Sequence, residues 1–229
     1  TETTKVLFDA LAGRQGFNYE LRNTGTNAGH AYGSFTSDTN SGNRFINLNA
    51  GTYRLILTRP FVSGPIIAEA FSLRLATLSQ LQGDSIVYGT ALTNRLSSGT
   101  ETIAHQFSAQ SGDILSIIPN VTAGGSSVWR LIDSRGIVVA DARSGSSPLP
   151  GFTVGWPGTY TLLIDGVLTN TSSVDYQLSI TLDGHIDPLP VGGQLALGTT
   201  RVDQVSASTS KSYRFTVSER SLVVVSGKR

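Results

Sequence analysis

Catalytic chemistry needs imidazole, carboxylate, hydroxyl or thiol groups at set spacings, and this chain of 229 residues shows no such set. It has three histidines, His30, His105 and His185, far apart in the sequence, and no cysteine. It has no Gly-x-Ser-x-Gly turn for a nucleophilic serine, no His-Glu-x-x-His pair for zinc and no phosphate-binding glycine loop. The sequence therefore predicts a protein that is not an enzyme.

Calcium is the one cofactor for which the sequence offers ligands, because it binds oxygen atoms of aspartate, asparagine and backbone carbonyls. The candidate ligands are Asp133 and Asp141, at the ends of "DSRGIVVAD", and Asp183 and Asp187, in "DGHID". The stretch "DSRG" is also a good type I turn, in which Arg135 would neutralise the first aspartate. Calcium binding and turn formation are the two alternatives for these carboxylates.

A glycan-binding surface needs exposed aromatic rings with polar neighbours. The candidate rings are Trp156, Phe152, Tyr32 and Phe35. Trp156 stands out, because "GFTVGWPGTY" places it in a turn bounded by Gly and Pro, while the matching place near Asn49 has no ring. These rings predict either a ligand surface or side chains that cap the end of a sandwich.

The charge balance and the hydropathy of the sequence limit the classes of partner that the chain is expected to bind. Basic and acidic residues number 17 and 16 with no basic run, which argues against a nucleic-acid partner. The longest apolar runs, such as "FVSGPIIAEAF", contain Gly, Pro or a charge and are shorter than the roughly 20 residues of a membrane helix. The expected partners are an extracellular glycan or protein and neighbouring repeats of the same chain.

Strand signals dominate the chain: short alternating or β-branched runs stand between clusters of Gly, Asn, Ser and Pro. The one helix-compatible stretch is 67–82, and there the alternation of Phe71, Leu73 and Leu75 favours a strand. The sequence therefore predicts an all-β fold with little helix. The expected strands are 5–11, 18–23, 31–36, 44–48, 52–58, 70–77, 85–89, 102–108, 114–118, 127–133, 136–141, 152–154, 159–165, 175–182, 194–198, 211–217 and 221–226.

The same stretches occur twice. "GTYRLILT" at Gly51 returns as "GTYTLLID" at Gly158, "YELRN" returns as "WRLID", and "FSLRL" as "YQLSI". A second set of matches joins the stretch from Ile86 to the one from Leu195, with Gly89 aligned to Gly198 and Phe107 to Phe215. One repeat of about 108 residues runs through the chain.

This repeat predicts two tandem antiparallel β-sandwich units with a jelly-roll-like strand arrangement. The partial first unit would expose sheet edges, so we expect it to be completed by the C-terminal stretch or by another chain. The predicted parts are a partial unit at 1–80, a complete unit at 84–184, a linker at 185–193 and the opening of a following unit at 188–229. An alternative frame divides the chain into sandwiches at 1–110 and 111–229.

Four stretches in order, "HQFSAQSGDILSI", "SVWRLIDSRGIVVADA", "PGTYTLLIDG" and "DYQLSITL", resemble the bacterial pre-peptidase C-terminal domain. That family is a β-sandwich module of secreted proteases and of repeat arrays in large exported proteins. The resemblance covers 84–184 and part of the flanks, and it implies a secreted or surface-exposed bacterial protein. Ser126 and Ser127 stand where the family usually carries an acidic pair, so the resemblance does not bring a calcium site with it.

The expected function is a non-catalytic structural or adhesive repeat module that spaces or presents other domains. The alternative is a carbohydrate- or ligand-binding module whose loops contact the ligand. A third class, an accessory domain of a secreted hydrolase, rests on the resemblance alone.

Overall fold

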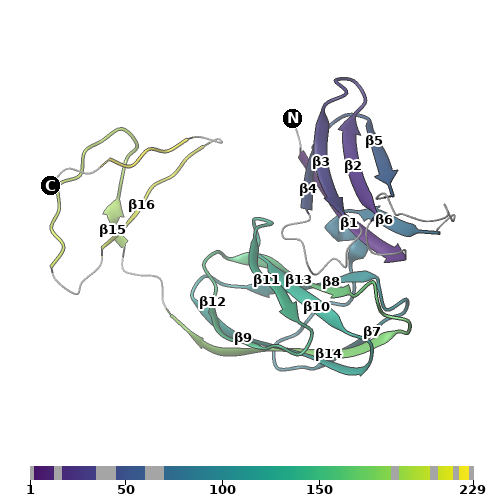
Figure 1. The fold of residues 1–229 in the computed structure, drawn as a ribbon. Helices are drawn as coiled ribbons and strands as arrows, with labels where there is room; N and C mark the ends of the chain where they lie inside the picture. The colour runs from purple at the N-terminus through teal and green to yellow at the C-terminus, as the bar shows by residue number, and fades with distance from the viewer. Residues whose placement is uncertain are drawn as a thin grey trace. The chain divides into compact units, whose positions relative to one another are not determined.

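The computed structural model describes residues 3–12, 17–34, 45–59, 70–186, 191–206, 211–218 and 222–226. Within that part of the chain, every regular element is a β-strand except one short 3-10 turn, η1 (Leu78–Leu81), so the predicted all-β class with little helix is confirmed. No helix of these residues has the length and apolar character to cross a membrane. The chain forms two compact units, Thr1–His185 and Ile186–Arg229 (Figure 1).

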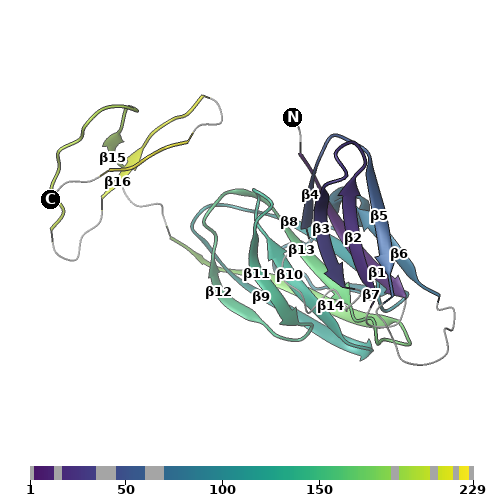
Figure 2. The ribbon, with the colours of Figure 1, turned by 45° about the horizontal axis from the view of Figure 1, so that its top comes forward.

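The N-terminal subdomain, described residues 3–76, contains two three-stranded sheets. Its strands are β1 (Thr3–Ala12), β2 (Asn18–Asn23), β3 (Gly29–Ser34), β4 (Phe45–Asn49), β5 (Tyr53–Thr58) and β6 (Ser72–Ala76). The sheet orders are β4-β1-β6 and β3-β2-β5, all antiparallel, and Figure 2 shows β2, β3 and β5 side by side. Phe8 of β1 stacks on Tyr19 of β2 with ring centroids 4.1 Å apart, which joins the two sheets through a shared core.

The central sandwich follows, with two four-stranded antiparallel sheets that face each other. Its strands are β7 (Leu92–Leu96), β8 (Thr102–Ala109), β9 (Asp113–Gly124), β10 (Ser127–Ile132), β11 (Val138–Ser144), β12 (Leu149–Thr153), β13 (Gly158–Gly166) and β14 (Val174–His185). The sheet orders are β11-β10-β13-β8 and β12-β9-β14-β7. Side chains that alternate along both sheets fill the space between them, among them the fully buried Trp129, Leu162 and Ile117.

The two subdomains share one strand arrangement. The N-terminal order β4-β1-β6 corresponds to β12-β9-β14, and β3-β2-β5 corresponds to β11-β10-β13. The pairing register agrees as well, because Leu21 lies opposite Leu55 and the matching Leu131 lies opposite Leu162. Among described residues 3–76, no strand corresponds to β7 or β8, which are edge strands of the central sandwich.

Strand β13 is buried on both faces. Leu162 and Ile164 point into the sandwich core, while Leu163 packs in a separate cluster with Leu7 of β1 and Leu81 of η1. The sheet β11-β10-β13-β8 therefore has the second sheet of the sandwich on one face and the N-terminal subdomain on the other (Figure 1). Because β13 is covered on both faces, its run "YTLLIDG" is apolar without strict alternation of apolar and polar residues.

The strand predictions were wrong at four places, one of which is 194–198, where residues 195–198 form no strand. Residues 85–89 form no strand, because Thr90 closes a turn onto the carbonyl of Val87, although Ile86 still enters the core. Strand β7 was missed, since its polar Asn94 and Arg95 hide the alternation that ends at the buried Leu96. The described residues 222–226 also form no strand.

In the C-terminal segment, residues 191–226, two short strands pair. They are β15 (Val191–Gln194) and β16 (Ser212–Arg214), and they run parallel. Most of the described apolar side chains here are exposed, for example Val205 at 61% and Leu222 at 93%. The segment therefore buries little apolar surface of its own.

Candidate functional site

The N-terminal subdomain meets the central sandwich in a contact that we call the joint. Its apolar part combines Leu7 and Ala76 from the N-terminal subdomain, Leu81 of η1, and Leu163 and Ile132 from the sandwich. Leu7 and Leu163 are completely buried, and burying a leucine contributes about 1.5–3 kcal/mol relative to leaving it exposed. The joint therefore has an apolar core of its own, in addition to those of the N-terminal subdomain and the central sandwich.

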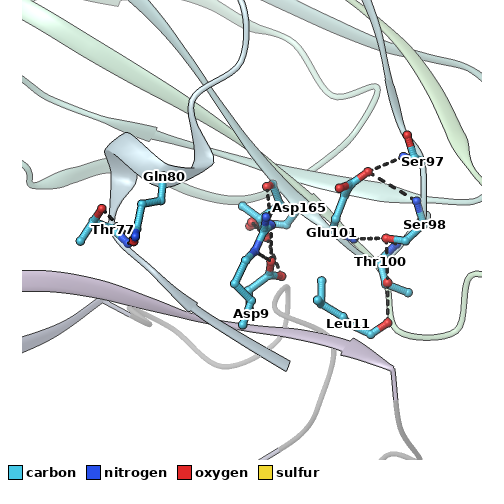
Figure 3. Close-up of polar contacts among 11 residues, drawn as sticks. Asp9, Leu11, Thr77, Gln80, Ser97, Ser98, Thr100, Glu101 and Asp165 are labelled. Carbon is cyan, nitrogen blue, oxygen red and sulfur yellow. Dashed lines mark hydrogen bonds and ion pairs between the residues drawn. The ribbon is translucent and has the colours of Figure 1, made fainter. Parts of the chain in front are cut away.

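A buried acid lies at the centre of the joint (Figure 3). Asp9 of β1 has no exposed surface and stands directly opposite Arg74 of β6. Arg74 donates to Asp9 Oδ2 from Nε at 3.0 Å and from Nη2 at 2.6 Å, and Nη2 also donates to the Thr102 carbonyl at 3.0 Å. One arginine thus connects a carboxylate of the N-terminal subdomain to the backbone of β8.

A second buried acid approaches from the sandwich. Asp165 of β13 lies opposite Thr102 of β8, and the Thr102 Oγ1 atom lies 3.0 Å from Asp9 Oδ1 and 3.1 Å from Asp165 Oδ1. Arg130 Nη1 is 3.4 Å from Asp165 Oδ2, and neither side chain is more than 1% exposed. The network therefore brings together two carboxylates and two guanidinium groups, so the buried charges balance.

The Thr102 hydroxyl carries one proton and can donate it to only one of the two carboxylates. Burial raises the pKa of the Asp9 carboxyl above its ordinary value, although Arg74 acts in the opposite direction. The hydroxyl lies within donating distance of Asp9 Oδ1 and of Asp165 Oδ1, so it donates to one carboxylate at a time.

Further hydrogen bonds connect the two subdomains around this network. Thr100 Oγ1 donates to the Leu11 carbonyl at 2.5 Å, and Lys5 Nζ donates to the Gly136 carbonyl. In the connection before η1, the Thr77 N–H donates to Gln80 Oε1 at 2.8 Å and the Gln80 N–H donates to the Thr77 carbonyl at 3.0 Å (Figure 3). The chain thus passes between the two subdomains through a capped turn.

The joint residues gave a signal in the sequence that was missed. Asp9, Arg130 and Asp165 each interrupt an apolar strand, in "VLFDALA", "SVWRLI" and "TLLIDG". Charged residues are seldom fully buried unless they are paired, so a charge inside an apolar run indicates a buried polar contact. The partners could not be found this way, because Asp9 and Thr102 are separated by 93 positions.

The histidines have structural partners. His105 is buried, with Nδ1 2.8 Å from the Asp84 carbonyl and Nε2 2.8 Å from the Tyr176 hydroxyl. A carbonyl only accepts, so Nδ1 carries the proton and Tyr176 donates to Nε2. Burial lowers the pKa of His105 and raises that of Tyr176, which keeps both groups neutral at pH 7. His185 Nδ1 lies 2.8 Å from Asp113, and His30 Nε2 lies 2.5 Å from the Asn47 carbonyl.

Two of the four predicted aromatic residues are connected to Tyr160. Trp156 is 54% exposed in the turn before β13, and its backbone carbonyl accepts from the Tyr160 hydroxyl at 3.0 Å. Phe152 of β12 is half-buried, and its ring contacts the Tyr160 ring. The Arg135 guanidinium lies 4.5 Å from the centre of the Trp156 ring. Tyr32 is 68% exposed, but it belongs to the N-terminal subdomain, and Phe35 lies outside the described residues.

The predicted calcium ligands are in separate elements. Asp133 Oδ1 accepts from the backbone N–H groups of Arg135 and Ile137, both at 2.9 Å, and Oδ2 accepts from the Arg135 side chain, as in the turn alternative. Asp183 of β14 is exposed and accepts from Ser116 and Thr181. Asp141 has its backbone in β11, but its side chain, like all of Asp187, lies outside the description. Among the described residues, no three His, Cys, Asp or Glu side chains are arranged to hold a metal.

No protein family matches the sequence, and no curated protein matches it either. Solved structures with partial similarity include two periplasmic inhibitors of g-type lysozyme, both called PliG. The Aeromonas hydrophila protein is 12% identical with a TM-score of 0.35, covering 44% of this chain and 96% of its own. The Salmonella Typhimurium protein is 16% identical with a TM-score of 0.32, covering 43% and 97%. TM-scores this low carry neither a fold nor an activity over to this chain.

We expect Asp9→Asn to remove a pH dependence from the stability of the chain. Because burial raises the folded-state pKa of Asp9, its contribution is fully present below its ordinary pKa of 3.8 and is lost as the pH rises through the folded-state value. The free energy of urea unfolding of the wild type should therefore fall relative to the variant as the pH rises above 3.8.

Asp175→Asn is the matched control for this measurement. The hydrogen bond from Arg95 lowers the pKa of the Asp175 carboxyl, so the wild type should gain stability relative to this variant as the pH rises toward 3.8 and should show no fall above it. A difference between wild type and Asp9→Asn that does not change with pH would show that burial does not shift the Asp9 pKa.

Calcium binding stays a prediction, and thermal unfolding tests it. A ligand of the folded state stabilises by mass action, so a calcium concentration of 100 times Kd adds about 2.7 kcal/mol and raises Tm by several degrees. Asp183→Asn should abolish the rise, while Asp203→Asn, in the C-terminal segment, should retain it. Equal melting temperatures in calcium and in chelator would rule out the site.

Proposed function

We propose that this chain is a non-catalytic connecting module that holds neighbouring β-sandwich units in one fixed orientation and so spaces or presents other domains. The observation that supports this most is the joint: a buried apolar cluster surrounding Asp9, Arg74, Thr102, Asp165 and Arg130. A flexible tether would need none of these buried charges.

The physics of buried ion pairs supports a fixed angle. Removing one partner of a buried pair typically costs about 3–5 kcal/mol, because the remaining charge stays in a low-dielectric site. Sliding the N-terminal subdomain along β8 and β13 would separate Asp9 from the Thr102 hydroxyl and Arg74 from the Thr102 carbonyl together. A single arrangement therefore satisfies the network, whereas domains with small polar interfaces move relative to one another.

We further propose that the connecting module belongs to a secreted or surface-exposed bacterial protein, where it has a structural or adhesive role. The support for export is the resemblance of 84–184 to the pre-peptidase C-terminal domain. An accessory role beside a secreted hydrolase has the resemblance as its only support.

A fixed joint is tested by the distance between two spin labels. The chain has no cysteine, so Thr26→Cys in the exposed β2–β3 turn and Gln177→Cys on β14 place one label on each subdomain. We expect pulsed electron resonance to give one narrow distance distribution, because the joint allows a single orientation.

Two variants of the labelled chain complete this test. Arg74→Ala should broaden the distribution, since it leaves Asp9 buried without its cation. Arg95→Ala removes an exposed ion pair of the sandwich, with Asp175, and should leave the distribution unchanged. A broad distribution in the wild type would contradict a connecting function based on a fixed angle.

A second candidate function is ligand binding at the end of the central sandwich that carries Trp156. The supporting observation is the 54% exposure of this indole, with the Arg135 guanidinium 4.5 Å from the ring centre. An exposed ring beside a fixed cation offers stacking and hydrogen bonding to a sugar.

If this end binds glycans, a glycan array should give reproducible signals that Trp156→Ala abolishes. Tyr32→Ala, at a ring of similar exposure on the N-terminal subdomain, serves as the matched control and should leave the signals intact. A blank array, or signals that Trp156→Ala does not change, would exclude glycan binding by this ring.

A further inference from the structure

A polar groove lies beside strand β8 of the central sandwich, and none of the described residues that line it belongs to the joint. Its volume is about 390 Å³, and it lies between residues 85–88 on one side and residues 106–108 with Thr159 on the other. Ligand sites of proteins begin at roughly 300 Å³. The groove is therefore large enough for one ring-sized ligand.

Hydrogen bonds fix the two sides of the groove against each other. The Ile86 N–H donates to the Gln106 carbonyl at 2.8 Å, and the Tyr88 hydroxyl donates to the Ser108 carbonyl at 2.7 Å. Burial raises the pKa of Tyr88 to about 12, so its hydroxyl stays protonated and keeps donating at neutral pH. The groove is therefore formed before a ligand binds, which reduces the entropy cost of binding.

Uncharged polar side chains line the groove. Ser108 of β8 lies opposite Thr159 of β13, and Gln106 is two positions away on β8, so their side chains point to the same outer face of the sheet. Ser85 adds a hydroxyl from the other side. None of these four side chains forms a hydrogen bond with a described residue. Their hydroxyls and the Gln106 amide are therefore available to a ligand.

The chemistry of the lining argues against two classes of ligand. No described residue of the lining is charged, so an ionic ligand would find no ion-pair partner. An added peptide strand needs free carbonyls on β8, but those of Gln106 and Ser108 already accept hydrogen bonds. The N–H groups of these two residues face the same edge as their carbonyls, because both groups of a strand residue point to one side. The groove therefore suits an uncharged ligand with many oxygen atoms.

The sequence repeat distinguishes the turn beside the groove from the polar lining. Gly89 ends this side of the groove with a φ of 74°, and the matching Gly198 has a φ of 77°, a left-handed conformation that favours glycine. Tyr88, which precedes the turn, corresponds to Leu197, which has no hydroxyl. The shared turn therefore does not require the Tyr88 hydroxyl, which is a feature that the central sandwich adds to it.

We propose that this groove binds an uncharged sugar residue, such as a hexose or an N-acetylhexosamine of a glycan. The sugar oxygens accept from the N–H groups of Gln106 and Ser108 and exchange hydrogen bonds with the Thr159 hydroxyl. Val87, which is 63% exposed, and the half-buried Tyr88 ring offer apolar contact to the C–H groups of the sugar. This site depends neither on the connecting function nor on the ring of Trp156.

Amide NMR spectra of the full-length chain test the site directly. The methyl glycosides of glucose, galactose, mannose and N-acetylglucosamine are titrated separately at millimolar concentrations. We expect at least one of them to shift the amide signals of Gln106 and Ser108 until the site is saturated. Glucuronate, a charged sugar, should shift neither signal. No saturable shift with any of the four neutral sugars, or equal shifts with glucuronate, would overturn the proposal.

Variants of the groove, followed at the Ser108 signal, test its side chains. Gln106→Ala and Thr159→Val each remove a polar group that contacts the sugar, and each should weaken binding by about fivefold or more. Gln177→Ala is the matched control, because it removes the same side chain as Gln106→Ala from an exposed position on β14, in the other sheet. Wild-type affinity in both groove variants, or equal weakening by Gln177→Ala, would contradict binding in the groove.

Trp156→Ala distinguishes this site from the second candidate function. The shifts of the Gln106 and Ser108 signals should persist in this variant, whether or not the variant changes the signals of the glycan array. If Trp156→Ala abolishes the shifts, the sugar is bound at the Trp156 ring and not in the groove, and the proposal is overturned.

Discussion

The buried contact of Asp9 and Asp165 with the Thr102 hydroxyl joins the two subdomains of the compact unit Thr1–His185. These two acids come from different subdomains and contact the same hydroxyl, with Arg74 and Arg130 beside them. Such an arrangement is stable only when every partner is in place, because an isolated buried charge is far more costly than an exposed one. The apolar cluster of Leu7, Leu81 and Leu163 belongs to the same joint.

The joint also explains where the two copies of the repeat diverge. In β5, the residues that point away from the core are Arg54, Ile56 and Thr58, and the first and last of them are exposed. At the matching places of β13, Thr161, Leu163 and Asp165 are buried, because the N-terminal subdomain covers that face. Positions that are alike in the two copies build the shared sandwich, and positions that differ build the contact between them.

Much of the strand pattern was predictable, because a strand shows its buried face in every second residue. Strands β2, β5, β8, β10 and β13 were placed within one or two residues for this reason. The pattern failed for β7, whose polar residues hide it, and for 222–226, where β-branched residues form no strand. The predicted ligand residues Trp156 and Asp133 have described positions, but the joint was not predicted at all.

The sequence by itself determined the strands, their apolar faces and the repeat of one sandwich arrangement, since side-chain alternation and turn preferences are local. The tertiary structure decided which outer face becomes buried and which charges meet there. Arg74 and Asp9 are 65 positions apart, and Asp9 and Thr102 are 93 apart, so no local pattern connects them. Only the packing of the N-terminal subdomain on the central sandwich brings together the three charged residues that interrupt apolar strands, and so forms the joint.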